Sequence, residues 1–183
     1  MTVPDEAVPA WAVERVRLVP ADPRWRDEAR GLASSVEHEL GARLAGPVHH
    51  IGSTSVPHLA AKPVLDLMAA MSTFDDAPAV AAALAPSGWV LVPLELDARP
   101  SRRFLVHVVD EARHAHLHLV LENSDELSLH LAFRDRLRAE PGLRGEYAAL
   151  KAALAARFPD DRERYTDGKA AFILAAAGPG AER

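Results

Sequence analysis

The segment HHIGSTSVPHLAAKPVLDLM, His49–Met68, decides the fold that the sequence predicts. It begins in a short strand, PVHHI, that leads into the turn Gly52–Ser55, where glycine lets backbone amides approach a bound anion. It continues into KPVLDLMAAM, whose almost unbroken apolar character predicts a central strand covered on both faces. One carboxylate, Asp66, interrupts this strand, and it is costly to bury unless something pairs with it.

A Gly-Ser turn followed by a lone aspartate on the next strand suggests a phosphate site with a metal ion. Amides and hydroxyls of the turn would hold the phosphate, a lysine would offset its charge, and Asp66 would bind Mg²⁺. The candidate phosphate ligands are Gly52, Ser53, Thr54, Ser55 and Lys62. The alternative interpretation is an ordinary turn with a helix cap, because this residue pair is common in turns.

The composition indicates one soluble globular domain. The chain has 183 residues, and its 49% hydrophobic content is enough for a sizeable core. We expect the domain over residues 13–177, a loose tail over 1–12 and a frayed end over 178–183. The absence of cysteine excludes disulfides and fits a reducing cytoplasm. A net charge of −5 and no membrane-length apolar run lead us to expect a cytoplasmic protein with no membrane or nucleic-acid partner.

Hydrophobic periodicity predicts an α+β fold, in which helices pack a small mixed β-sheet and a C-terminal helical block follows. The first helix is expected from Asp22, as its cap, to Gly41, where glycine ends it. Extended segments are expected at 13–20, 47–51, 62–71, 89–97, 102–109 and 114–121. Further helices are expected at 77–86, after Asn123 to about Pro141, from there to Phe158, and over 167–177.

Histidines alternate along the second half of the expected hairpin, so His114, His116 and His118 share one face of the strand. A four-residue loop DEAR would pair His107 with His116. That pairing would place His107 and Arg103 on the same face, giving four imidazoles and a guanidinium beside Asp66.

This histidine face allows three interpretations. Two histidines and Asp66 suit a transition metal such as Zn²⁺, Mn²⁺ or Fe²⁺. Protonated histidines would instead contact phosphate oxygens or act as general acid or base near neutral pH. The third interpretation is a solvated polar face without a chemical role.

The longer string HIGSTSVP…LAAKPVLDL resembles the GrpB family, a branch of the nucleotidyltransferase superfamily that includes polymerase-beta-like enzymes. LVPADPRW, RHAHLHLV and the C-terminal stretch LAFRDRLRAEPGLRGEYAALKAALAARF also fit the family pattern, in order, so the resemblance covers nearly the whole chain. It implies a nucleotidyltransferase-like fold with a nucleotide-related site, and hence Mg²⁺ and a nucleoside triphosphate as cofactors. Related domains occur joined to dephospho-CoA kinases, which adds a CoA-related or auxiliary role by analogy.

The sequence departs from that pattern at its acidic pair. Catalytically active nucleotidyltransferases carry two carboxylates on this strand, separated by one residue, and together these carboxylates bind the metal ions. Asp66 fills the first position but Met68 fills the second, and a thioether is a poor ligand for a hard cation. Glu95, Asp97 and Asp135 are candidates for the missing carboxylate, and the alternative for Glu95 and Asp97 is an ordinary solvated strand face. His58 also stands where the family usually has glycine.

Basic residues of the C-terminal half are further candidates. Arg134 and Arg138 are four residues apart and share a helix face, so one of them could clamp a phosphate, and the resemblance favours Arg134 with Asp135. Lys151 and Lys169 would contact an anionic ligand. The alternatives are a solvated helix face for the arginines and snorkelling for the lysines.

The predicted function is binding of a nucleotide or related phosphorylated small molecule, with transfer of a nucleotidyl or phosphoryl group to a small-molecule acceptor. Asp66, His116 and His118 are the predicted catalytic residues. Asp66 and His118 are the predicted metal ligands. One alternative is a degenerate nucleotidyltransferase fold that only binds a ligand as an auxiliary, CoA-related module. The other is a mononuclear metal enzyme that uses His107, His116 and His118. The sequence leaves the oligomeric state open.

Overall fold

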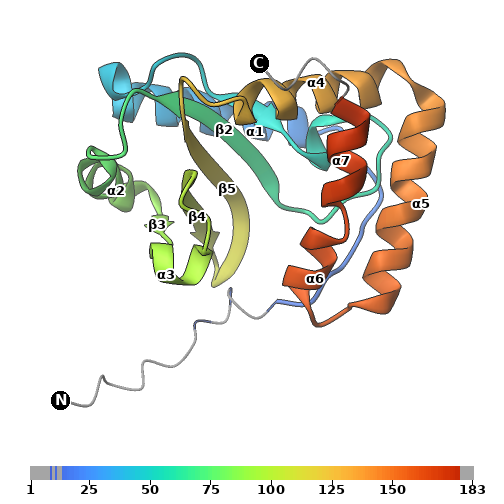
Figure 1. Ribbon diagram of the computed structural model, residues 1–183. Helices are drawn as coiled ribbons and strands as arrows, with labels where there is room; N and C mark the ends of the chain where they lie inside the picture. Colours follow the sequence, from blue (N-terminus) through green and yellow to red (C-terminus); the bar gives the residue numbers. More distant parts are fainter. Residues whose placement is uncertain (1–8, 10, 12–13, 178–183) are drawn as a thin grey trace.

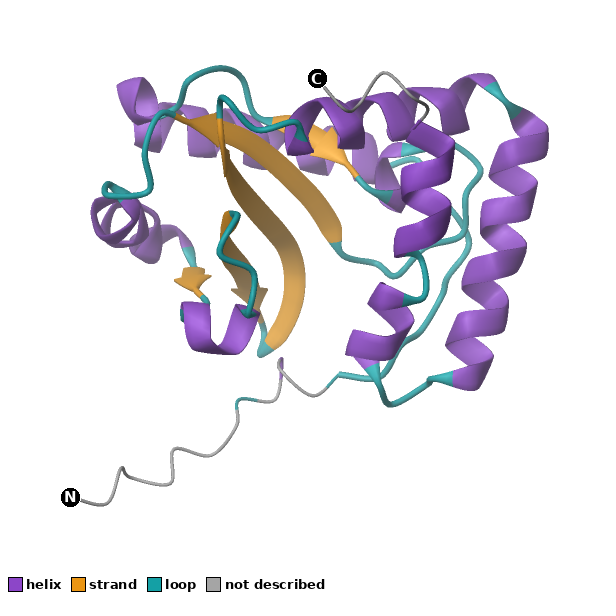
Figure 2. Cartoon of the chain, in the orientation of Figure 1, coloured by secondary structure: helices purple, strands orange, loops and turns teal. Residues whose placement is uncertain are grey.

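The computed structural model describes residues 9, 11 and 14–177 (Figure 1). The predicted tails over 1–12 and 178–183 lie outside the described residues, apart from residues 9 and 11. Helices surround one mixed sheet, and the last four helices form a block beside it (Figures 1 and 2). The predicted α+β architecture, with a mixed sheet and a C-terminal helical block, is confirmed.

The sheet has five strands in the order β1-β2-β5-β4-β3. β2 and β5 run parallel, and the other neighbouring pairs are antiparallel. The strands are β1 (His49–Ile51), β2 (Leu65–Met71), β3 (Trp89–Leu91), β4 (Arg102–Val109) and β5 (Ala112–Leu121). The parallel pair lies between antiparallel neighbours, so β2 has neighbours on both edges and is central as predicted.

The helices are α1 (Trp25–Leu40), α2 (Ala77–Leu84), α3 (Leu94–Asp97), α4 (Glu126–Ala139), α5 (Pro141–Arg157), α6 (Arg162–Asp167) and α7 (Ala170–Ala177). Single 3₁₀ turns are η2 (Gly41–Arg43), η3 (Ser53–Ser55) and η4 (Ala85–Ser87). α1 ends at Gly41, as predicted, where φ is 52°. Among the described residues, no helix combines the length and apolar character needed to cross a membrane.

Three expected elements differ in the structure. The third strand stops at Leu91, because Pro93 begins the short helix α3, so Glu95 and Asp97 are helical. Residues 13–20, where they are described, form an extended lead-in with one bridge between Val19 and Ala61. The last helix, expected over 167–177, is α7 and begins at Ala170, and the short helix α6 before it was not expected.

Two apolar layers enclose β2. Leu65, Leu67 and Ala69 point into a core shared with α1 and α2. Met68 points to the opposite face, where it packs with Ile51 and Val120 beneath partly buried leucines of α4. Asp66 shares the face of Met68 because their positions differ by two, so Asp66 points toward the helical block.

Candidate functional site

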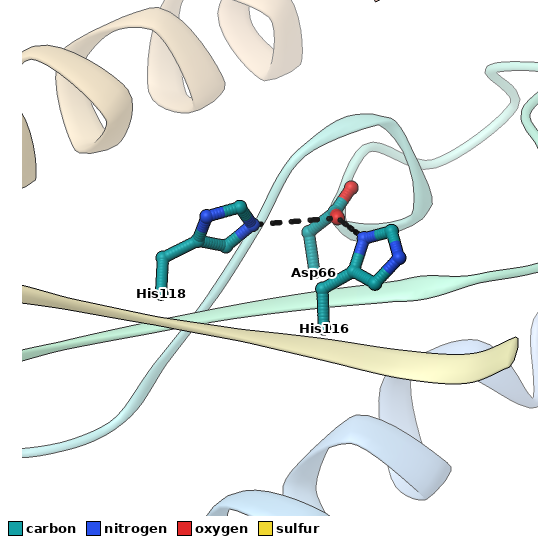
Figure 3. Close-up of side chains that lie close together, drawn as sticks. All are labelled: Asp66, His116 and His118. Carbon is teal, nitrogen blue, oxygen red and sulfur yellow. Dashed lines mark hydrogen bonds and ion pairs between the residues drawn. The ribbon is translucent and has the colours of Figure 1, made fainter. Parts of the chain in front are cut away.

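The parallel register of β2 and β5 sets Asp66 beside His116, and Met68 beside His118. The Asp66 Oδ1 atom lies 2.9 Å from His116 Nδ1 and 3.8 Å from His118 Nε2, as Figure 3 shows. Ligand atoms of the three residues all lie within 4.8 Å of one another. The three residues predicted as catalytic are therefore brought together.

The larger histidine face predicted from the hairpin is wrong. Asp110 and Glu111 form a two-residue turn with φ of 49° and 59°, so DEAR is not a four-residue loop. The new register pairs His107 with Ala115, on the opposite side of the sheet from His116. His107 packs against Trp89, with ring centroids 4.9 Å apart, and its Nδ1 lies 3.2 Å from His114 Nδ1.

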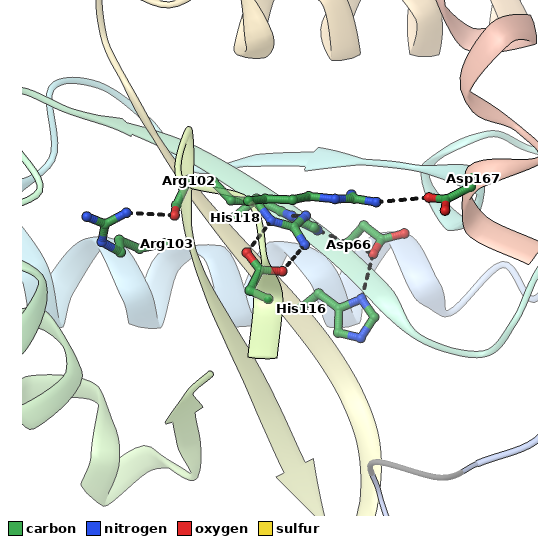
Figure 4. A network of polar contacts seen from close by, with 8 residues as sticks. Asp66, Arg102, Arg103, His116, His118 and Asp167 are labelled. Carbon is green, nitrogen blue, oxygen red and sulfur yellow. Dashed lines mark hydrogen bonds and ion pairs between the residues drawn. The ribbon is translucent and has the colours of Figure 1, made fainter. Parts of the chain in front are cut away.

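Arg102 takes the place that the sequence assigned to Arg103. Arg103 pairs with Leu119 on the other face, and its guanidinium stacks on Phe74 at 4.1 Å. Arg102 Nη1 instead lies 2.7 Å from His118 Nδ1 (Figure 4). Sequence alternation alone could have found Arg102 had the turn length been known.

A buried ion pair holds Arg102 in position. Its guanidinium donates to both carboxylate oxygens of Asp97, with distances of 2.5 and 2.9 Å, and the two side chains are 13% and 6% exposed. Asp97 therefore lies two hydrogen bonds away from His118, and its charge is already paired. Phe104 supports this arrangement, because the Arg102 guanidinium lies 4.5 Å above its ring.

These contacts assign opposite tautomers to the two imidazoles. Arginine only donates, so His118 Nδ1 accepts from Arg102 and the proton of the neutral ring is on Nε2, facing Asp66. An ionised carboxylate only accepts, so His116 Nδ1 carries the proton and donates to Asp66. His116 Nε2 then presents a lone pair, and this buried atom has no partner among the described residues.

Burial keeps both imidazoles neutral while Asp66 stays ionised. Burial lowers the pKa of His116 to about 4, although the Asp66 carboxylate opposes the shift. Burial also lowers the pKa of His118. Burial raises the pKa of Asp66, but the hydrogen bond from His116 and the nearby N–H of His118 outweigh burial and hold that pKa well below its usual range.

The Gly-Ser turn packs directly on Asp66. Gly52 has φ of +66°, and a Cβ atom there would overlap Asp66 Oδ2, so only glycine fits without strain. Ser55 Oγ donates to the Gly52 carbonyl at 2.6 Å, and Thr54 Oγ1 lies 2.9 Å from His50 Nε2. These bonds within the turn fix its hydroxyls, and Ser53, at the start of η3, is half-buried.

Two arginines of α4 donate hydrogen bonds to backbone carbonyls at the end of β1 and in the Gly-Ser turn. Arg134 Nη1 donates to the His50 carbonyl at 3.1 Å, while its Nε donates to Asp135 at 2.8 Å. Arg138 donates twice to the Ser55 carbonyl, at 3.1 and 2.9 Å. The structure thus directs Arg134 to backbone and Asp135, and its contact with a ligand stays a prediction.

The chain contains three lysines, Lys62, Lys151 and Lys169. All of them lie near Asp66, whose negative charge opposes the lowering of each lysine pKa by burial. The ammonium groups of Lys62 and Lys169 lie 5.4 and 4.4 Å from the centre of the Tyr165 ring. Lys151 donates to the Ala60 carbonyl. Among the described residues, no carboxylate forms an ion pair with any of these lysines.

Crowding and burial weaken the charge of these lysines. Burial lowers the pKa of Lys62 to about 7, and the charges of Arg162 and Lys169 add to the effect. Burial likewise lowers the pKa of Lys151 to about 7 and that of Lys169 to about 8. A bound anion would reverse these shifts, so the cluster is suited to an anionic ligand.

The second acidic position is apolar in the structure as well. Met68 is 1% exposed and belongs to the core beneath α4. None of the three acidic candidates replaces it: Asp97 pairs with Arg102, Asp135 pairs with Arg134, and Glu95 is exposed on α3. Asp66 is therefore the one carboxylate of the described residues that reaches the turn.

Asp66 fits Mg²⁺ better than the three residues fit a transition metal. Mg²⁺ commonly binds one or two carboxylates together with substrate phosphates and water, which one aspartate beside the Gly-Ser turn allows. A transition metal on His118 would need the Nε2 lone pair, but Arg102 keeps the proton on that atom. Ligation by His118 would thus require Arg102 to move away.

Two residues near the site add to what the sequence indicated. Burial lowers the pKa of His130 on α4 to about 4, followed by the charge of His118, and the Asp66 carboxylate opposes the shift. His130 is four residues before Arg134 and so shares its helix face, a spacing from which the sequence could have identified it. His58, where the family usually has glycine, has φ of 64°, a conformation that favours glycine.

Comparison with known proteins decides the family. The GrpB protein family model matches residues 15–177. The chain belongs to the GrpB family. A crystal structure of conserved protein GrpB from Enterococcus faecalis is 30% identical and superimposes with a TM-score of 0.76 over 88% of this chain and 94% of that one.

Curated relatives are longer than the region they share with this GrpB-family chain. UPF0157 protein YqkA of Bacillus subtilis is 34% identical over 70% of this chain and 37% of its own length. UPF0157 protein PA4798 of Pseudomonas aeruginosa is 34% identical over 85% of this chain and 64% of its own length. A dephospho-CoA kinase of Mycobacterium tuberculosis is 30% identical over 86% of this chain and 44% of its own length.

The wider fold is that of nucleotidyltransferases. The polymerase core of TRAMP, an RNA surveillance complex, shares 14% identity and a TM-score of 0.50 over 83% of this chain and 50% of that one. At this identity the likeness shows the fold alone. The predicted family and the nucleotidyltransferase-like fold are both confirmed.

Proposed function

We propose that this protein binds a nucleotide or a related phosphorylated small molecule at Asp66. The observation that carries the proposal is the convergence of all three lysines of the chain on one carboxylate, without ion-pair partners among the described residues. Phosphate oxygens would meet Ser53 and the backbone of Gly52, and Lys62 and Lys169 would neutralise their charge.

Asp66 would hold one Mg²⁺ ion, which would offset the negative charge that a carboxylate and a phosphate bring together. The usual two-metal arrangement for nucleotidyl transfer needs a second carboxylate, and Met68 is buried in its place. This favours a ligand-binding role over efficient two-metal transfer.

A second candidate function is nucleotidyl or phosphoryl transfer to a small-molecule acceptor. The observation that favours it is the unpartnered lone pair of His116 Nε2, which is free to accept a proton from an acceptor hydroxyl. In this proposal His116 is the base, Asp66 fixes its tautomer, and the N–H of His118 faces Asp66 at 3.8 Å.

A thermal-shift series tests the binding proposal. The melting temperature would be measured with ATP, other nucleoside triphosphates, dephospho-CoA and CoA, each with and without Mg²⁺. A ligand that binds only the folded state raises the melting temperature, by several degrees when its concentration is about 100 times Kd. CoA derivatives are included because one relative carries the name dephospho-CoA kinase.

Substitutions test whether the thermal shift arises from binding at Asp66. Asp66→Asn should remove the Mg²⁺-dependent part of the shift, and Lys169→Gln should reduce the whole shift. Arg43→Gln removes the same charge from an exposed 3₁₀ turn and should leave the shift unchanged. No shift with any of these ligands in the wild type would refute the binding proposal.

Turnover separates the second candidate from the first. Radiolabelled triphosphate, with Mg²⁺ and candidate acceptors, would be assayed for release of pyrophosphate, the product of nucleotidyl transfer, or of nucleoside diphosphate, the product of phosphoryl transfer. His116→Gln should abolish release while keeping the thermal shift. A wild type that binds but never releases either product supports the auxiliary role.

A further inference from the structure

A second basic site adjoins the first at Lys62. A cleft of about 300 Å³ lies along the extended lead-in, the start of β5 and the start of α6. Its charged lining consists of Glu14, Arg15, Arg17, Lys62, Arg113 and Arg162. Such a volume is at the small end of ligand sites in proteins.

The carboxylates near the cleft neutralise only part of its positive charge. Glu14 accepts from Arg162 Nη1 at 3.0 Å and from the Arg113 backbone amide at 2.9 Å. Arg15 pairs with Asp160 at 2.6 Å. Within the part of the chain that the structure describes, Arg17 and Lys62 pair with no carboxylate.

Several cations of the cleft, paired or not, are close enough to repel one another. Burial lowers the pKa of Arg113 to about 10, and the neighbouring charge of Arg162 lowers it further while Glu14 opposes the shift. Arg162 also lowers the pKa of Lys62. An anion bound between these groups would relieve that repulsion, and guanidinium groups offer it paired N–H donors.

We propose that this cleft binds the phosphate group of a second small molecule, next to the ligand held at Asp66. Arg17 and Arg162 would contact the phosphate from the rim, Arg113 would contribute charge, and Lys62 would lie between the two ligands. The arginines of the cleft make no hydrogen bond or ion pair to Asp66, His116 or His118 within the described residues, so their contribution can be tested apart from the Asp66 site.

Titration calorimetry with inorganic pyrophosphate at low ionic strength tests the cleft. The double variant Ser53→Ala/Lys169→Gln serves as background, because it weakens the Asp66 site. Pyrophosphate should still bind this background. Adding Arg17→Gln or Arg162→Gln should weaken binding about tenfold each, as expected for a charge-assisted hydrogen bond. Adding Arg43→Gln, equal in charge and outside the cleft, should have no effect.

Arg162→Gln also breaks the ion pair with Glu14, so it can affect folding as well as binding. Arg17→Gln does not have this problem, because the Arg17 side chain is exposed and its loss does not threaten folding. Unchanged binding in Arg17→Gln and Arg162→Gln, or no binding to the background, would overturn the proposal. Equal affinity for citrate would refute the phosphate assignment. Tighter binding of a single-stranded oligonucleotide, with the same arginine dependence, would replace the small molecule by nucleic acid.

Discussion

At the residue scale, the chemistry depends on how hydrogens are distributed around Asp66. Arg102 and Asp66 impose different tautomers on two histidines of the same strand, so one ring offers a buried lone pair and the other an N–H. Residue types alone do not encode this distinction, because both positions read simply as histidine.

Removing Arg102 should release His118 from its tautomer. In Arg102→Met/Asp97→Leu, which leaves no unpaired buried carboxylate, nitrogen NMR of the histidine rings should show the His118 proton shared between Nδ1 and Nε2. In the wild type the proton should reside on Nε2. The double variant should also bind Co²⁺ more tightly than the wild type, and an unchanged His118 spectrum would contradict the assignment.

Gly52 is the residue with the least freedom to change. Gly52→Ala should lower the free energy of unfolding by more than about 1 kcal/mol, because φ is +66° and the new methyl group would overlap Asp66. Denaturant unfolding measures the loss. Gly46→Ala is the matched control, with nothing within 4 Å of its Cβ position, and it should be close to neutral.

At the element scale, α4 positions the Gly-Ser turn. Arg138→Gln should leave the Ser55 carbonyl without its paired donors and so speed amide hydrogen exchange in η3, with a stability loss of about 1 kcal/mol. Exchange measured by mass spectrometry checks this. Arg144→Gln on α5 is a control, since Arg144 bonds the backbone carbonyls of Leu137 and Arg138 rather than the carbonyl of Ser55. Equal exchange in η3 for both variants would contradict the role given to Arg138.

The sequence predicted elements whose signal is local, and it missed those that depend on backbone strain. KPVLDLMAAM predicted β2 because a long apolar run has few alternatives. The two-residue turn at Asp110 and Glu111 places non-glycine residues at positive φ, which no local preference favours. That one turn shifted the register, and with it the places of His107 and Arg102.

The candidate site was predictable in its parts and less so in its assembly. The sequence identified Asp66, the Gly-Ser turn and each lysine separately. The convergence of Lys62, Lys151 and Lys169 depends on how α5, α6 and α7 pack against the loop before β2, and periodicity does not report packing between distant helices.

At the scale of the whole molecule, the buried histidines couple stability to pH. Burial lowers the pKa of His50, His116 and His130 to about 4, below the ordinary value of 6.5 that applies in the unfolded chain. Between these values the unfolded chain binds more protons than the folded one, so stability rises with pH in that window and is lost on acidification from about 6.5 to 4.

Urea unfolding at a series of pH values measures this loss, to which a fully buried imidazole such as His116 contributes up to about 3 kcal/mol. His116→Gln should flatten the pH dependence between about 6.5 and 4, whereas the exposed His38→Gln should leave it unchanged. A wild type whose stability is constant over this window would contradict the buried, neutral state of these rings.

Lysine occurs at no other position in the chain, so chemical labelling of lysine side chains reports on this site. Acylating reagents require the neutral amine, and burial has already lowered the pKa of Lys62 to about 7 and of Lys169 to about 8. Each adduct counted by mass spectrometry on a lysine side chain would therefore report on one small region, with Lys151 shielded at 2% exposure. Protection from labelling would reveal an occupant of the site before its identity is known.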